Sequence, residues 1–289
     1  MTARAGALAA LALVLAAACG GSASGSGPPA PAASPAAGPG LQVAVVATQL
    51  TPGTRRVPFG VLDHGAPVSD ARVHVRVSFA SQPLAEADAP FEGGGLEGRG
   101  LYVARLALLV AGLWMASVDV RRPSGESATV DAAFRVAAST DVPAVGQPAP
   151  RSRTRTASEA GDVSLIDSGT PPDDMHQLSI ADAIGRHLPT LVVFATPAFC
   201  QTATCGPQIH AIQELEPAYR DRVAFIHVEV YEDFRLDPSK RRLAPAMGEW
   251  HLQTEPWTFL IDRTGIIRAE FEGATGTEAL RPALDQLLA

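Results

Sequence analysis

The pattern of hydrophobic and polar positions changes near residue 140. Before that point the two kinds of residue alternate, most regularly in 73–79 and 114–120. Alternation with a period of two predicts half-buried β-strands. Further strand candidates, separated by turns rich in glycine and proline, are 41–48, 57–62, 101–109 and 129–136. Such a series of short strands predicts an all-β, immunoglobulin-like sandwich over residues 41–138.

After residue 175 the pattern becomes one of continuous apolar runs separated by helical segments. The apolar runs are 191–195, 223–231 and 257–261, and a further strand candidate is 266–271. Helices are expected at 180–187, 207–219, 243–251 and 277–288. Apolar strands with crossover helices, followed by a hairpin and a final helix, predict a mixed α/β sheet over residues 175–289.

The first 18 residues have the pattern of a signal peptide. The apolar run Ala7–Ala18 is shorter than the roughly 20 residues that a membrane-spanning helix needs. It leads into Leu15–Gly20, which resembles the lipobox of bacterial lipoproteins and implies that Cys19 is lipidated. Residues 20–40 consist of Gly, Ser, Pro and Ala, which predicts a flexible tether. We expect a protein anchored by lipid to the outer face of the cell membrane, with an ordinary secretory signal as the alternative.

Composition narrows the class of protein. The chain has 23 Lys and Arg against 30 Asp and Glu, a net charge of −7, which argues against nucleic acid as a partner. Residues 41–140 are neutral overall, whereas 141–289 carry a charge of −8, in agreement with two modules. Residues 139–174 are rich in Pro, Ser, Thr, Gly and Asp, which predicts a linker and the start of the second domain.

Two cysteines and one proline carry the candidate chemistry. Cys200 and Cys205 follow the apolar run 191–195, and Pro256 stands directly before the run 257–261. This order, together with Val145–Pro150, resembles the thioredoxin superfamily, and the resemblance covers about residues 140–289. It implies a thioredoxin-like α/β fold for the C-terminal domain.

The resemblance also implies a reaction and a site. The reaction is thiol–disulfide exchange on extracytoplasmic proteins, with Cys200, Cys205 and a cis-proline at Pro256 in the catalytic site and no cofactor. Glu255 and Trp257 would then lie beside the substrate. The cysteine spacing departs from the family, because thioredoxins have C-x-x-C where this chain has four intervening residues.

The spacing limits where the two cysteines can lie. Residues five apart in a regular α-helix are about 140° apart around the axis and about 7.5 Å apart along it. A disulfide needs Cα atoms roughly 4.4 to 6.8 Å apart. We therefore expect Cys200 in a loop and Cys205 at a helix N-terminus, where backbone N–H groups favour a thiolate. The order of attack stays open: position after the strand favours Cys200, which we prefer, whereas the local sequence Cys205–Pro207 favours Cys205.

Three other interpretations use the same residues. A copper chaperone resembling the Sco family would bind copper through Cys200, Cys205 and His251. A peroxiredoxin-like site would use Thr202 and Cys205, but Pro197 is one position too early for that motif. A non-catalytic adaptor would keep the two cysteines as a structural disulfide. His227 and Glu229 share one face of a predicted strand, and we interpret them as a core histidine and a strand-end carboxylate.

The lipoprotein hypothesis predicts the effect of one substitution. Cys19→Ser removes the thiol that would carry the lipid, and the protein should move from the membrane fraction to the soluble fraction. Fractionation followed by immunoblotting measures this. Unchanged membrane association of Cys19→Ser would contradict the hypothesis.

Overall fold

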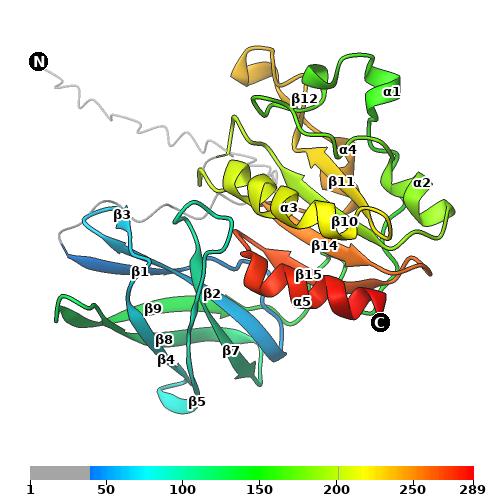
Figure 1. Ribbon diagram of the computed structural model, residues 1–289. Helices are drawn as coiled ribbons and strands as arrows, with labels where there is room; N and C mark the ends of the chain where they lie inside the picture. The colour runs from blue at the N-terminus through cyan, green and yellow to red at the C-terminus, as the bar shows by residue number, and fades with distance from the viewer. Residues whose placement is uncertain (1–39, 201) are drawn as a thin grey trace, which may run out of the picture. The chain divides into compact units, whose positions relative to one another are not determined.

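The computed structural model describes residues 40–200 and 202–289 (Figure 1). The predicted signal peptide, Cys19 and the tether up to residue 39 lie outside these residues. Within the described part of the chain, no helix has both the length and the apolar character needed to cross a membrane.

The N-terminal half consists of two antiparallel sheets around one core. The first sheet has the order β1-β2-β7-β6, with β3 paired to β2, and the second has the order β5-β4-β8-β9. The strands are β1 (Leu41–Val45), β2 (Gly53–Asp63), β3 (Ala66–Pro67), β4 (Arg72–Phe79), β5 (Gln82–Asp88), β6 (Phe91–Glu92), β7 (Leu101–Leu108), β8 (Gly112–Arg121) and β9 (Ser127–Val136). The alternation in 73–79 and 114–120 lies in β4 and β8, where Val75 and Trp114 point into the shared core.

The C-terminal half is built on a mixed four-stranded sheet of order β11-β10-β14-β15. β10 pairs with β11 in parallel and with β14 antiparallel, and β14 and β15 form a hairpin. These strands are β10 (Thr190–Ala195), β11 (Ala224–Glu229), β14 (Trp257–Ile261) and β15 (Ile267–Glu272). A small second sheet pairs β12 (Tyr231–Glu232) with β13 (Arg242–Leu243).

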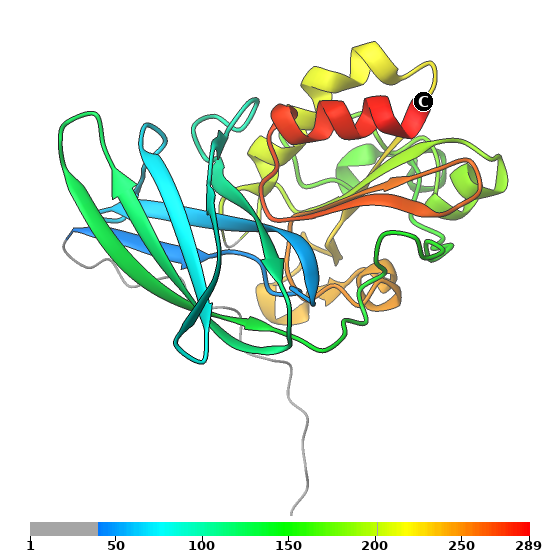
Figure 2. The same cartoon turned by 90° about the horizontal axis from the view of Figure 1, so that it is seen from below.

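Helices cover both faces of the mixed sheet. The helices are α1 (Ala157–Ala160), η1 (Val163–Leu165), α2 (Ile180–Gly185), α3 (Cys205–Tyr219), η2 (Pro238–Lys240), α4 (Pro245–Glu249) and α5 (Thr277–Leu288). α3 and α5 lie together on one face (Figure 2), where they pack on Leu191 and Val193. α2 and α4 pack on Val192 and Phe194 from the other face. The apolar runs are continuous because successive side chains of each strand are buried on opposite faces.

The predicted fold class is wrong. We expected a sandwich followed by an α/β thioredoxin-like domain, but the C-terminal half forms no clear thioredoxin fold. Of the described residues, 37% lie in strands, which form four sheets, and 19% lie in helices. Two of the four expected C-terminal helices are only one or two turns long. α2 ends at Gly185 because His187 adopts a left-handed φ of 55° ahead of Pro189, and α4 starts late because Leu243 pairs in β13.

Residues 139–174, predicted as a linker, carry buried side chains. Along 151–156 exposed arginines alternate with buried Ser and Thr, as in an extended segment with one covered side. Ser152 is 2% exposed and accepts a hydrogen bond of 3.0 Å from Nε1 of Trp250. Pro148 forms a β-bridge with Ile266. The segment therefore packs on the elements that follow it, while the proposed domain boundaries themselves stay a prediction.

This packing predicts a stability difference between neighbouring positions. Ser152→Ala leaves the buried Trp250 N–H without its acceptor, which should lower the free energy of unfolding by about 1 to 3 kcal/mol. Arg153→Ala, at an exposed position, should change it by less than about 0.5 kcal/mol. Urea denaturation measures both. Equal, negligible effects would show that the segment behaves as a linker.

Candidate functional site

Cys200 lies at the N-terminus of α3. Its Sγ accepts a hydrogen bond of 3.3 Å from the backbone N–H of Cys205, the first residue of this 15-residue helix. The hydroxyl of Thr202 is also 3.3 Å from the sulfur. The N-cap residue Thr204 makes no side-chain capping bond, so the sulfur takes the place of a cap.

These contacts lower the pKa of Cys200. The hydrogen bond from the Cys205 thiol lowers it most, the contacts with Thr202 and the backbone N–H groups of Cys205 and Thr204 add to this, and together they outweigh burial. The pKa of Cys200 falls to about 5, compared with an ordinary value of about 8.5. This pKa favours the thiolate of Cys200 at neutral pH, and the residue is partly exposed.

Cys205 has the opposite properties. It is 0% exposed and packs among the side chains between α3 and the sheet. The hydrogen bond to Cys200, burial and the negative charge of Cys200 raise the pKa of Cys205 far above its usual range, and the charge of Glu255 adds to this. The two sulfurs thus form an asymmetric pair of one partly exposed thiolate and one buried, protonated thiol.

The residue before Cys200 is held from two sides. The guanidinium carbon of Arg241 lies 3.8 Å from the ring centroid of Phe199, within cation–π distance. The ring of Phe234 lies 5.9 Å from it on a tilted plane. Both partners come from the segment after β12. Side-chain packing therefore connects that segment to the loop between β10 and α3, which we call the cysteine loop.

The other predicted site residues, Glu255, Pro256 and Trp257, differ in how they relate to the cysteines. The peptide bond between Glu255 and Pro256 is cis, as predicted. Glu255 is close enough to act on the pKa of both Cys205 and Tyr231. Trp257 is 3% exposed, stacks on Phe259 at 5.5 Å and donates to Thr254. Its position is explained by core packing, and it offers little surface to a substrate.

His251, the third ligand of the copper hypothesis, is exposed and follows the short helix α4. Within the described residues, one group of three or more His, Cys, Asp or Glu side chains brings its donor atoms within 4.8 Å of one another, and it contains neither cysteine nor His251. The three candidate copper ligands are therefore not brought together.

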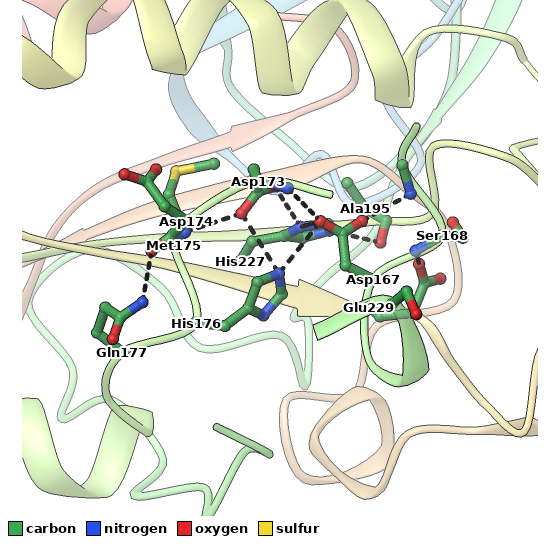
Figure 3. A network of polar contacts seen from close by, with 12 residues as sticks. Asp167, Ser168, Asp173, Asp174, Met175, His176, Gln177, Ala195, His227 and Glu229 are labelled. Atoms are coloured by element: carbon green, nitrogen blue, oxygen red, sulfur yellow. Dashed lines mark hydrogen bonds and ion pairs between the residues drawn. The ribbon is translucent and has the colours of Figure 1, made fainter. Parts of the chain in front are cut away.

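That group consists of Asp167, Asp173, His176 and His227 (Figure 3). Burial alone would lower the pKa of His227, but Asp173 and then Asp167 and Glu229 outweigh burial and raise it to about 9. Burial would raise the pKa of Asp167, but contacts with both histidines and two backbone N–H groups lower it to about 2. From the sequence, His227 was expected to be a core histidine, and the two aspartates lie in the predicted linker. The available signal was the spacing Asp167, Asp173, His176 within a polar segment.

Comparison with known proteins gives little guidance. No protein-family model and no curated protein matches the chain. Three solved structures show weak likeness, each with a TM-score of 0.21. The PmoD soluble domain from Methylocystis sp. is 14% identical, and the match covers 30% of this chain and 77% of that one. The PKD domain of the human receptor SorCS2 is 18% identical, and the match covers 45% of this chain and 98% of that one. Murine CRIg is 14% identical, and the match covers 35% of this chain and 97% of that one. None of the three is thioredoxin-like.

The asymmetric cysteine pair predicts distinct reactivities. Iodoacetamide should alkylate Cys200 with a half-maximal rate near pH 5 and leave Cys205 unmodified in the folded protein, because the thiolate is the reacting form. Cys205→Ala removes the thiol donor and should raise the pKa of Cys200, whereas Cys205→Ser keeps a donor and should shift it less. Mass spectrometry after timed alkylation at several pH values measures this. Faster labelling of Cys205 would contradict the assignment.

Proposed function

We propose that the protein exchanges thiols and disulfides with other proteins, with Cys200 as the nucleophile and Cys205 as the resolving cysteine. The observation that carries this proposal is the partly exposed residue Cys200 before α3, whose sulfur accepts from the backbone N–H of Cys205 and is hydrogen-bonded to the buried Cys205 thiol. A structural disulfide does not require one partly exposed cysteine and one buried cysteine with oppositely shifted pKa values. The proposal rests on this geometry and not on a fold family.

The first step forms a mixed disulfide. The Cys200 thiolate attacks one sulfur of a substrate disulfide, so that a Cys200–substrate S–S bond forms and the substrate S–S bond breaks. The departing substrate sulfur leaves as a thiolate and takes up a proton from solvent. Helix α3 favours this step because its N-terminal N–H groups keep Cys200 deprotonated.

The second step releases the substrate. The Cys205 thiol gives its proton to solvent, and its sulfur attacks the sulfur of Cys200. The Cys200–Cys205 disulfide forms, the Cys200–substrate S–S bond breaks, and the second substrate sulfur leaves as a thiolate that takes up a proton from solvent. The substrate is reduced by two electrons and the protein is oxidised by two. Both steps run in reverse when the protein donates its disulfide. No cofactor is needed, because the sulfurs carry the electrons.

The low pKa of Cys200 favours the reverse direction. A stabilised thiolate stabilises the reduced protein, so the Cys200–Cys205 disulfide accepts electrons readily. We infer that the pair acts as a disulfide donor, with a reduction potential above about −230 mV. The lipid anchor proposed at Cys19 would place this reaction outside the cytoplasm, where disulfides persist.

Trapping experiments test the order of attack. Incubated with a peptide that contains one disulfide, Cys205→Ser should accumulate a covalent adduct at Cys200, because the resolving thiol is missing. Cys200→Ser should form at least about tenfold less adduct, because Cys205 is buried and protonated. His251→Ala should resolve its adducts as the unsubstituted protein does. Non-reducing gels and mass spectrometry measure all three.

Other outcomes would remove the proposal. Strong adduct formation by Cys200→Ser alone would assign the nucleophile to Cys205. Absence of adducts in both variants, with a reduction potential below about −300 mV, would show that the pair is a structural disulfide. Loss of Cu(I) binding in all three variants, without adducts, would favour a copper carrier.

A further inference from the structure

A group of four buried side chains lies apart from the cysteine pair in the chain and in chemistry. Asp167, Asp173 and His176 come from the loop between η1 and α2, and His227 comes from β11 (Figure 3). The side chains of His176 and His227 are 2% and 0% exposed. Two carboxylates and two imidazoles are seldom buried together without a charge that balances them.

The donor atoms are spaced as ligands of one small metal ion. Nε2 of His176 is 3.4 Å from Oδ2 of Asp167 and 3.3 Å from Oδ1 of Asp173. Nδ1 of His227 is 2.8 Å from Oδ2 of Asp173 and 3.9 Å from Oδ2 of Asp167. A tetrahedron with metal–ligand bonds of about 2.0 to 2.1 Å has edges of about 3.3 to 3.4 Å. The two distances from His176 agree with these edges. The two distances from His227, which meets the other oxygen of Asp173, lie about 0.5 Å to either side of them.

The hydrogen bonds of His227 fix which of its nitrogens faces the group. Nε2 is 3.2 Å from the carbonyl oxygen of Ala195, and a carbonyl can only accept, so Nε2 carries the hydrogen. Nδ1 then faces the two carboxylates and needs either a second proton or a cation. A backbone carbonyl bonded to the distal nitrogen is the usual arrangement for a histidine that binds a metal ion.

His176 adds an independent observation. Its Nε2 is buried, points at the two carboxylates and has no hydrogen-bond partner. An unsatisfied buried nitrogen is costly, and a metal ion between it and the carboxylates would satisfy it. Backbone N–H groups already orient the carboxylates: Gly169 and Asp173 donate to Asp167, and Met175 donates to Asp173.

We propose that Asp167, Asp173, His176 and His227 bind one Zn²⁺ ion in a closed, structural site. Two nitrogen and two oxygen donors that lie within 4.8 Å of one another suit Zn²⁺, whereas Ca²⁺ takes six to eight oxygen ligands and Cu(I) prefers sulfur. The dication balances the two carboxylates. A surface hollow of about 360 Å³, lined in part by Asp167, Asp173 and Gly206, provides an entry path.

The ion would fasten the loop that precedes α2 to the central sheet. Ser168, next to Asp167, accepts a hydrogen bond of 3.1 Å from the backbone N–H of Ala198 in the cysteine loop. The proposed metal site is therefore connected to the cysteine loop through this hydrogen bond. The proposal does not depend on thiol chemistry, since neither cysteine is a ligand.

The experiment measures metal binding by the full chain with Cys19, Cys200 and Cys205 all replaced by serine, so that thiolates cannot contribute. After treatment with a chelator and dialysis against ZnSO₄, mass spectrometry of the metal should find one zinc per chain. Zinc should raise the melting temperature by about 5 °C or more. Co²⁺ in its place should give the intense visible bands of a tetrahedral site without thiolate ligands.

Matched variants identify the ligands. Asp167→Asn and His176→Gln should each weaken zinc binding at least about tenfold and abolish the rise in melting temperature. Asp174→Asn and His187→Gln change exposed residues of the same two types. These variants should keep both the zinc binding and the rise in melting temperature.

Three results would overturn the proposal. The first is less than 0.1 zinc per chain, roughly, with no change in melting temperature, which would identify the group as a proton-linked network of ion pairs. The second is undiminished zinc binding by both ligand variants. The third is an octahedral Co²⁺ spectrum. If the ligand variants fail to fold, the stoichiometry and the spectrum of the parent chain still decide.

Discussion

Burial of strand β10 on both faces is the constraint on which the C-terminal half depends. Its six residues are all buried, they alternate between the two helix-covered faces, and the strand pairs with β11 on one side and β14 on the other. A slip of one residue would exchange the two faces, so the register is strongly specified. The strand ends at Ala195, and the position of the cysteine loop follows from that end.

The end of β10 also connects two sites of different chemistry. The carbonyl of Ala195 orients His227, and the chain then turns through the cysteine loop into α3. In one site a helix N-terminus stabilises an anion near the surface. In the other, buried carboxylates require a cation. The carbonyl of Ala195 and the loop that follows it connect both sites to the end of the central strand.

The sequence predicted the elements better than the class of fold. The alternating pattern predicted β4 and β8, because a half-buried strand has an apolar residue at every second position. The continuous apolar runs predicted β10, β11 and β14, because these strands are buried on both faces. The positions of Cys200 in a loop and Cys205 at a helix start followed from helix geometry. The spacing of Asp167, Asp173 and His176 did not reveal their contact with His227, because that contact joins a loop to a strand more than 50 residues later. The burial of Trp257 could not be predicted either, because adjacency to Pro256 does not reveal which way a side chain points.

The packing of Phe199 has a consequence for the entropy of the cysteine loop. Arg241 and Phe234 restrict the residue that precedes Cys200, and α3 restricts the residue that ends the loop. A loop held at both ends loses little conformational freedom when a bond forms between its sulfurs. Formation of the proposed Cys200–Cys205 disulfide would therefore cost little conformational entropy, although four residues separate the cysteines. Weakening the aromatic contact would slow formation of the disulfide without changing the pKa values of the two thiols.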